Sequence, residues 1–345
     1  MNTREILVMG LIALLLWSGC REITVTTVVN RNGTFTRLIR ITGDSADVYN
    51  PDLPYPVDTS WAQEFKKDTA SKKDYILTYS KTFSNSEELN SEICSDSGWR
   101  KHLKRTVVVS RHFGFFYSYL RFKEVFQAAN PFTLLNYRDY LSPHDLRYIT
   151  GKHTINSESD STLIEEAKDK AELFLIASAT AEIEQILKNG LIRLDDPSLN
   201  PATVANFHDS IRKKVEEWNF TNTNQFVDYY RQWTGDEAVS RLHQFTPPLF
   251  EEFARKVALL DSIFGMKEYL NVVEMPGMLT ETNSYMLKGN QVSWEVQPMA
   301  ILFTDYEMYL ESRVVNNWAF VLTGIVILVL ILVLVVKAVK KKRSV

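Results

Sequence analysis

The pattern of hydrophobic and polar positions changes its period twice along this chain. Hydrophobic and β-branched residues alternate with polar ones over residues 23–29 and 34–42, on either side of Asn32-Gly33. Alternation of this kind predicts β-strands, and Asn-Gly accepts the positive φ angles of a tight hairpin turn. Alternating segments at residues 75–83 and 106–111 predict two more strands. We therefore expect the first third of the chain to form antiparallel sheet.

An aromatic segment follows at residues 113–126, and we predict that it forms one long strand. Four of its aromatic residues share one face of that strand in the two-residue period, namely Phe113, Phe115, Tyr117 and Tyr119. The opposite face is apolar too, so both faces should be covered, either by packed helices or by a bound apolar ligand. The four residues are thus candidates for one wall of an apolar-ligand site.

A period of three to four residues replaces the alternation after residue 133. Residues 162–188 carry apolar positions spaced by three and four, a Thr162-x-x-Glu165 capping box, and Gly190 as the expected stop. Shorter helices are expected downstream, at residues 201–218, 225–233, 236–245 and 249–264. The chain therefore contains a large helical block after its first strands.

The two-residue period returns near the C-terminal end. The strand candidates there are residues 272–275, 278–282, 291–296, 299–303 and 307–314. We predict an α+β fold, in which N- and C-terminal strands build one antiparallel sheet around a large helical insertion, with one C-terminal transmembrane helix. Pairing of the first and last strands would place the two ends of the domain near one another.

Two uninterrupted hydrophobic segments stand apart from these periods, and the first lies near the N-terminus. It covers residues 6–17, follows Arg4 and ends at Ser18-Gly19-Cys20. It is too short to span a bilayer, which needs about 20 apolar residues, and its layout is that of a secretory signal. The Gly-Cys ending resembles bacterial lipoprotein signals, in which the cysteine, here Cys20, is acylated, with palmitate for example, and becomes the first mature residue. The alternatives are an uncleaved anchor and ordinary signal-peptidase cleavage.

The second hydrophobic segment covers residues 318–336 and contains no charged residue. At about 1.5 Å per residue it measures about 28 Å, close to the ~30 Å hydrocarbon core of a bilayer. Trp318 stands where an interfacial aromatic residue belongs, and the basic run at residues 340–343 marks the cytoplasmic side. We expect a transmembrane helix with a cytoplasmic C-terminus.

Together the two segments predict a domain held outside the cytoplasm at a bacterial inner membrane, facing the periplasm or the exterior. The expected organisation is a signal peptide (1–19), a β-rich part (20–133), a helical insertion (134–266), strands that complete the sheet (267–315), a transmembrane helix (316–337) and a basic cytoplasmic tail (338–345). Attachment at both ends would keep the domain close to one membrane surface.

Composition narrows the function classes. A net charge of −3 over 345 residues, without a basic stripe, argues against nucleic acid as a partner. The two cysteines, Cys20 and Cys94, can form a disulfide only if Cys20 is not acylated. Six histidines lack the spacing of a metal site, and no nucleophile elbow or phosphate-binding loop occurs. We therefore expect no metal, no cofactor and no enzyme activity.

Several short motifs at the two ends of the chain resemble those of the LppM-type envelope lipoproteins. They are Gly19-Cys20, the Asn32-Gly33 hairpin, Met275-Pro-Gly277, Asn283, Gly289, Val292 and Trp294, ahead of the membrane helix and the basic tail. In that family a curved sheet cups a helix, and an apolar cavity has been proposed to hold lipid. The resemblance implies this architecture, from which the large helical block departs. It implies no functional residue, since the matching positions are turn and strand residues.

These observations lead to two functional hypotheses. In the first, a non-enzymatic, membrane-tethered cell-envelope lipoprotein acts as an interaction or structural module, and its helical block docks another envelope protein. In the alternative, the domain binds lipid or another apolar ligand along residues 113–126. The membrane is the expected partner in both, through the transmembrane helix and an acyl chain on Cys20.

Overall fold

Two facing β-sheets form the body of the structure. The structure is a computed structural model, and it describes residues 21–49, 53–67, 75–96, 100, 103–151, 158–217, 222–266 and 268–343. The first sheet has seven strands, in the order β3 (Ala62–Lys67), β4 (Tyr75–Phe83), β2 (Phe35–Gly43), β1 (Glu22–Val29), β7 (Tyr269–Glu274), β10 (Gln291–Val296) and β9 (Met286–Lys288). β1 and β2 pair antiparallel, and Gly33 between them has φ +92°. The predicted hairpin is therefore confirmed.

The second sheet has four strands, in the order β5 (Arg105–Phe113), β6 (Tyr117–Phe126), β11 (Tyr306–Val315) and β8 (Met278–Thr282). Both sheets combine N- and C-terminal strands, so the predicted α+β class is confirmed. The prediction of a single sheet is wrong, because the chain passes repeatedly from one sheet to the other, for example through α3 (Ser86–Ser95) and at Pro276-Gly277. As a result β1 pairs in parallel with β7, and the last strand β11 pairs with β6 and β8.

The main core lies between the inner faces of the two sheets. β1 and β6 bury every second residue, as the alternating sequence predicts. Side chains from both sheets meet there, for example Arg37 of β2 and Glu124 of β6, whose nitrogen and oxygen lie 2.8 Å apart. The sheets are therefore joined by contacts across a buried layer.

A helical arm is inserted between β6 and β7. Its elements, after η2 (Tyr137–Asp139) and α4 (Pro143–Ile149), are α5 (Glu158–Leu194), η3 (Pro201–Phe207), α6 (His208–Glu216), α7 (Gln225–Thr234), η4 (Glu237–Gln244) and α8 (Glu251–Gly265). The 37 residues of α5 measure about 55 Å. The predicted stop at Gly190 is wrong. A Cβ on Gly190 would lie 2.8 Å from Leu249 Cδ2, so this glycine allows a close approach inside the arm.

Two further short helices lie within the described residues outside the arm. α2 (Ser45–Tyr49) follows β2, and α9 (Ala300–Phe303) precedes β11. The prediction of a strand at residues 299–303 is wrong. All four residues of α9 are buried, and an uninterrupted apolar run of this length does not distinguish a buried strand from a buried helical turn.

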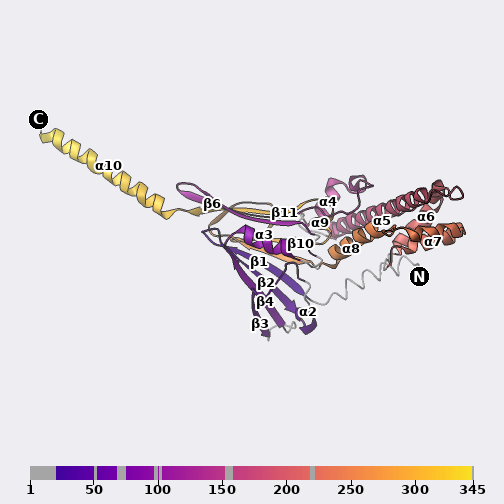
Figure 1. Cartoon of the computed structure of the whole chain (residues 1–345). Helices are drawn as coiled ribbons and strands as arrows, with labels where there is room; N and C mark the ends of the chain where they lie inside the picture. The colour runs from indigo at the N-terminus through magenta and orange to yellow at the C-terminus, as the bar shows by residue number, and fades with distance from the viewer. Residues whose placement is uncertain are drawn as a thin grey trace.

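α10 (Asn317–Arg343) leaves the sheets at the end opposite to the arm (Figure 1). Its segment Asn317–Ala338 has 22 residues; an 18-residue window within it has a mean hydropathy of 3.4, and 6% of that window is buried in the structure. This helix is long and apolar enough to cross a membrane.

β1 begins at the arm end of the body. Thr24 pairs with Leu270 at the start of β7, only a few residues after α8 ends at Gly265. From there β1 runs toward the end from which α10 leaves (Figure 1). The prediction that the two ends of the domain lie near one another is therefore wrong.

Candidate membrane-proximal site

The hairpin between β5 and β6 ends in a tight turn beside the start of α10. The Gly114 amide donates a 2.9 Å hydrogen bond to the Tyr117 carbonyl oxygen. A Cβ on Gly114 would lie 2.7 Å from that oxygen, so the turn requires glycine here. The prediction of one strand over residues 113–126 is wrong, because this turn separates Phe113, the last residue of β5, from β6.

Aromatic side chains of this turn pack on the first residues of α10. We call the group the aromatic collar, which consists of Phe113, Phe115, Phe116, Tyr117, Trp318 and Phe320. Ring centroids lie 5.4 Å apart for Phe115 and Trp318 and 5.0 Å apart for Phe116 and Phe320. Phe113 stacks on Trp318 at 6.1 Å. The turn and the helix thus share one aromatic surface.

The collar is exposed although it is large and apolar. The exposed fractions are 56% for Phe113, 46% for Phe115, 38% for Phe116 and 50% for Trp318. The apolar side chains of α10 that follow are exposed to a similar degree. The collar therefore continues the uncovered surface of the helix onto the domain.

Asn316 connects the β5–β6 turn to the start of α10 through hydrogen bonds. Its side-chain Nδ2 donates to the carbonyl oxygens of Gly114, at 2.7 Å, and Phe115, at 3.2 Å. Its backbone amide donates to the Phe116 carbonyl at 2.9 Å, and its Oδ1 accepts from the buried Ser118 hydroxyl at 3.0 Å. Two segments about 200 positions apart in sequence are therefore held by one buried side chain.

The four residues predicted as a ligand wall do not share a face. Tyr117 and Tyr119 point to the outer face of β6, whereas Phe113 pairs with the buried Ser118 and so points to the inner face. Phe115 lies in the turn between the strands. Among the described residues, the two best-formed hollows have volumes of about 10 Å³, room for a single water molecule, and neither contains these four residues. An apolar ligand at this position remains a prediction.

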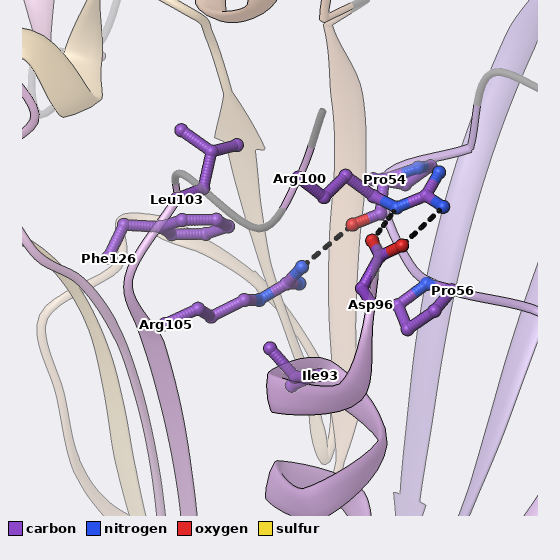
Figure 2. A pocket seen from close by; sticks show the side chains of 8 residues that line it. All are labelled: Pro54, Pro56, Ile93, Asp96, Arg100, Leu103, Arg105 and Phe126. Atoms are coloured by element: carbon purple, nitrogen blue, oxygen red, sulfur yellow. Dashed lines mark hydrogen bonds and ion pairs between the residues drawn. The ribbon is translucent and has the colours of Figure 1, made fainter. Parts of the chain in front are cut away.

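One of these hollows lies where the second sheet meets the segment before β3 (Figure 2). Arg100 is paired with Asp96 at 2.5 Å and donates to the Leu53 carbonyl, while Arg105 donates to the Pro54 carbonyl at 2.9 Å. The polar groups at its rim thus hold the surrounding segments to one another.

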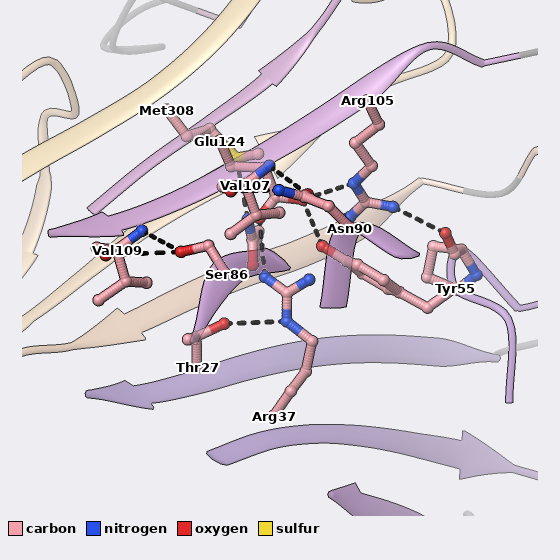
Figure 3. A network of polar contacts seen from close by, with 12 residues as sticks. Thr27, Arg37, Tyr55, Ser86, Asn90, Arg105, Val107, Val109, Glu124 and Met308 are labelled. Carbon is pink, nitrogen blue, oxygen red and sulfur yellow. Dashed lines mark hydrogen bonds and ion pairs between the residues drawn. The ribbon is translucent and has the colours of Figure 1, made fainter. Parts of the chain in front are cut away.

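A buried ionic network links the two sheets (Figure 3). Glu124 is fully buried, and its carboxylate accepts hydrogen bonds from Arg105 and Tyr55, both at 2.5 Å, and from Arg37 at 2.8 Å. Both guanidinium groups also lie against the Tyr55 ring, at 3.4 Å for Arg105 and 4.2 Å for Arg37. Asn271 of β7 donates to the same carboxylate at 3.3 Å. The single negative charge of Glu124 thus offsets part of the two buried positive charges of Arg37 and Arg105.

This network was not predicted from the sequence, although a signal for it exists there. Glu124 falls in the two-residue period of Leu120, Phe122 and Phe126, and is the charged member of that apolar face. Arg37 stands likewise at a buried position of β2. A charged residue in register with an apolar face predicts a buried ion pair, because an isolated charge there would cost too much.

Acid should weaken the network. Burial raises the pKa of Glu124, but Arg105 and Arg37 outweigh it and hold this pKa below its ordinary value. A carboxyl group with a lowered folded-state pKa contributes its full stability above the unfolded-state pKa and loses it as the pH falls through the folded-state value. We expect the melting temperatures of the full chain and of a Glu124→Gln variant, measured in detergent, to converge below about pH 5. The other carboxyl groups titrate in both proteins, so only Glu124 changes the difference between the two melting temperatures. A difference that stays constant down to about pH 3 would contradict this assignment.

Two motif positions of the resemblance, Asn283 and Gly277, lie where the chain passes between the sheets. The Asn283 side chain accepts from the Trp294 indole of β10 and from the Tyr309 amide of β11, each at 3.0 Å, and donates to the Glu307 carbonyl at 2.7 Å. Gly277 lies at the crossover from β7 to β8 with φ +88°. These residues are structural, as expected for turn and strand positions.

Cys20 lies outside the described residues. Cys94 is exposed and free. Within the described ranges no three histidine, cysteine or acidic side chains gather to hold a metal ion.

No protein-family model and no curated protein matches the chain. A solved structure that resembles it is the NMR structure of the folded domain of the Mycobacterium tuberculosis LppM protein. The identity is 9%, the match covers 87% of this chain and 94% of that chain, and the TM-score is 0.28. This is a weak likeness at the level of the fold.

Proposed function

We propose that the chain is a membrane-tethered cell-envelope lipoprotein whose domain is a non-enzymatic interaction or structural module. One observation carries the proposal, namely that α10 and the helical arm leave opposite ends of the two-sheet body (Figure 1). With α10 across the bacterial inner membrane and its basic end in the cytoplasm, the domain stands outside and the arm points away from the membrane. We also propose acylation of Cys20; because β1 begins at Glu22 at the arm end of the body, this acyl chain would lie at the end opposite α10 and would not enter the bilayer beside that helix.

The arm is well packed and its core is continuous with that of the body, which supports its use as a docking element. Large side chains are fully buried inside it, among them Phe226 and Tyr230 of α7 and Phe250 and Phe253 at the start of α8. A long, well-packed element offers partners an exposed helical surface at a distance from the sheets. Its length of about 55 Å gives that surface reach from the membrane.

The other end of the body supports a fixed orientation. The aromatic collar and Asn316 connect α10 to β5, β6 and β11 through ring contacts and hydrogen bonds. A domain joined to its membrane helix in this way holds the arm in a defined direction. Such geometry suits a module that meets a second envelope component at a set distance from the bilayer.

Site-specific crosslinking in intact cells tests this proposal. A photoreactive residue in place of the exposed Asn206, on η3 of the arm, should give one discrete crosslinked product, and Ala205 beside it should give the same product. Glu64, exposed on the edge strand β3, is the matched control and should give none. Products at Glu64 but not on the arm would contradict the docking role.

A separate measurement distinguishes the alternative function. Native mass spectrometry of the full chain, with lipid extraction, should show no lipid bound in stoichiometric amount to the domain. The apolar-ligand function would be favoured if one lipid molecule were bound per chain. The bound lipid should then be lost when a small residue near residues 113–126 is replaced by a larger one.

A further inference from the structure

We propose that the turn between β5 and β6 is a second membrane-inserted element, which enters the interfacial layer of the bilayer beside the first turns of α10. The proposal rests on α10 crossing the membrane, as proposed above. Its occupant is the lipid bilayer itself, because the exposed surface of the collar is continuous with that of α10.

The depth of the turn follows from its contacts. Phe115 packs on Trp318, and Phe116 and Tyr117 pack on Phe320, so the turn lies level with the first residues of the apolar helix. Tryptophan and tyrosine are enriched at this level of a membrane protein, where the hydrocarbon meets the headgroups. Lipid at this height would cover all six rings of the collar.

The backbone of the turn is prepared for a layer that is poor in water. A turn usually leaves carbonyl oxygens to the solvent, and in a membrane each unpaired group costs several kcal/mol. Here Asn316 pairs the carbonyl oxygens of Gly114, Phe115 and Phe116, and the Gly114 amide pairs with Tyr117. Pairing of these three carbonyl oxygens would lower the cost of placing the turn in the bilayer.

Basic side chains lie just above the collar. Arg111 is exposed two residues before Phe113 and donates to the Ser118 hydroxyl at 3.3 Å. The Arg313 guanidinium lies 4.6 Å from the Tyr117 ring centroid. Arginines at this height suit the phosphate groups of lipid headgroups, with their stems along the apolar surface.

Depth measurement by electron paramagnetic resonance tests the inference. The full chain, with Cys20 and Cys94 replaced by serine, is reconstituted in phospholipid nanodiscs and carries one nitroxide label. A label at Phe115→Cys should be accessible to oxygen and shielded from an aqueous nickel chelate. Ala128→Cys, exposed just past the opposite end of β6, is the matched control and should be open to the chelate.

A third label separates this inference from the function on which it rests. Val329→Cys lies in the middle of the apolar helix and should report the hydrocarbon core. Chelate access at Phe115 equal to that at Ala128, with Val329 shielded, would overturn membrane insertion of the turn alone. Chelate access at Val329 as well would overturn the membrane assignment itself. Thermal melts of the labelled variants confirm that each is folded.

Discussion

Replacing Glu124 with glutamine is expected to lower the free energy of unfolding by about 3–5 kcal/mol. The change keeps the shape of the side chain but removes the charge that faces Arg37 and Arg105, both of which are buried. Two guanidinium groups would then share a core without an anion, and their removal from water would be uncompensated. Urea denaturation of the full chain in detergent, followed by tryptophan fluorescence, measures the loss.

Glu307→Gln provides the matched control. Glu307 lies on β11 and pairs with Lys123 at 2.7 Å, but the two side chains are 39% and 45% exposed. Screening by water limits such a pair to about 1 kcal/mol or less. Equal losses in the two variants would show that the network between the sheets does not stabilise the fold more than a surface pair does.

Gly277→Ala should destabilise the domain by about 2 kcal/mol or more. Gly277 has φ +88°, and strain at such a position costs an L-residue about 1–3 kcal/mol. A Cβ there would also overlap the Arg313 carbonyl oxygen and lie 3.0 Å from its carbon. Overpacking against backbone adds about 1–3 kcal/mol, because the strand β11 cannot move aside without breaking its ladder.

Gly289→Ala isolates the contribution of the clash. Gly289 has a similar left-handed backbone, φ +63°, but nothing lies within 4 Å of its would-be Cβ. We expect a cost of about 1–2 kcal/mol from the backbone alone. Denaturation curves of the two variants should therefore differ, and coincident curves would show that β8 and β11 adjust freely at the crossover.

Local patterns predicted much of this fold. Alternation and Asn32-Gly33 identified β1, β2 and their hairpin, and helical spacing identified the arm. The failures are places where distant segments decide the outcome. Gly190 resembles a helix stop, yet α5 continues through it because Leu249 packs closely against it. The division into two sheets depends on the parallel pairing of β1 with β7. No local period in the sequence encodes this pairing.

The membrane-proximal site was predictable only in its parts. The sequence predicts that Trp318 is an interfacial aromatic residue and that the aromatic residues near Phe113 need a cover. Their meeting depends on Asn316 reaching the turn at Gly114, about 200 positions earlier in the chain. A single asparagine before an apolar helix carries no sequence signal for that contact, so the wall hypothesis placed Phe113 and Tyr117 on one face of a strand that the turn interrupts.

The direction of β1 has a mechanical consequence. β1 starts at the arm end, where Thr24 pairs with Leu270, whereas β11 ends at α10. Tension between the N-terminal end of the domain and α10 would pull β1 largely along its own length. β1 has β2 on one side and β7 on the other, and the hydrogen bonds to both run across the strand. They would be loaded together in shear instead of opening one by one, so the body would carry tension applied between β1 and α10 while it stays folded.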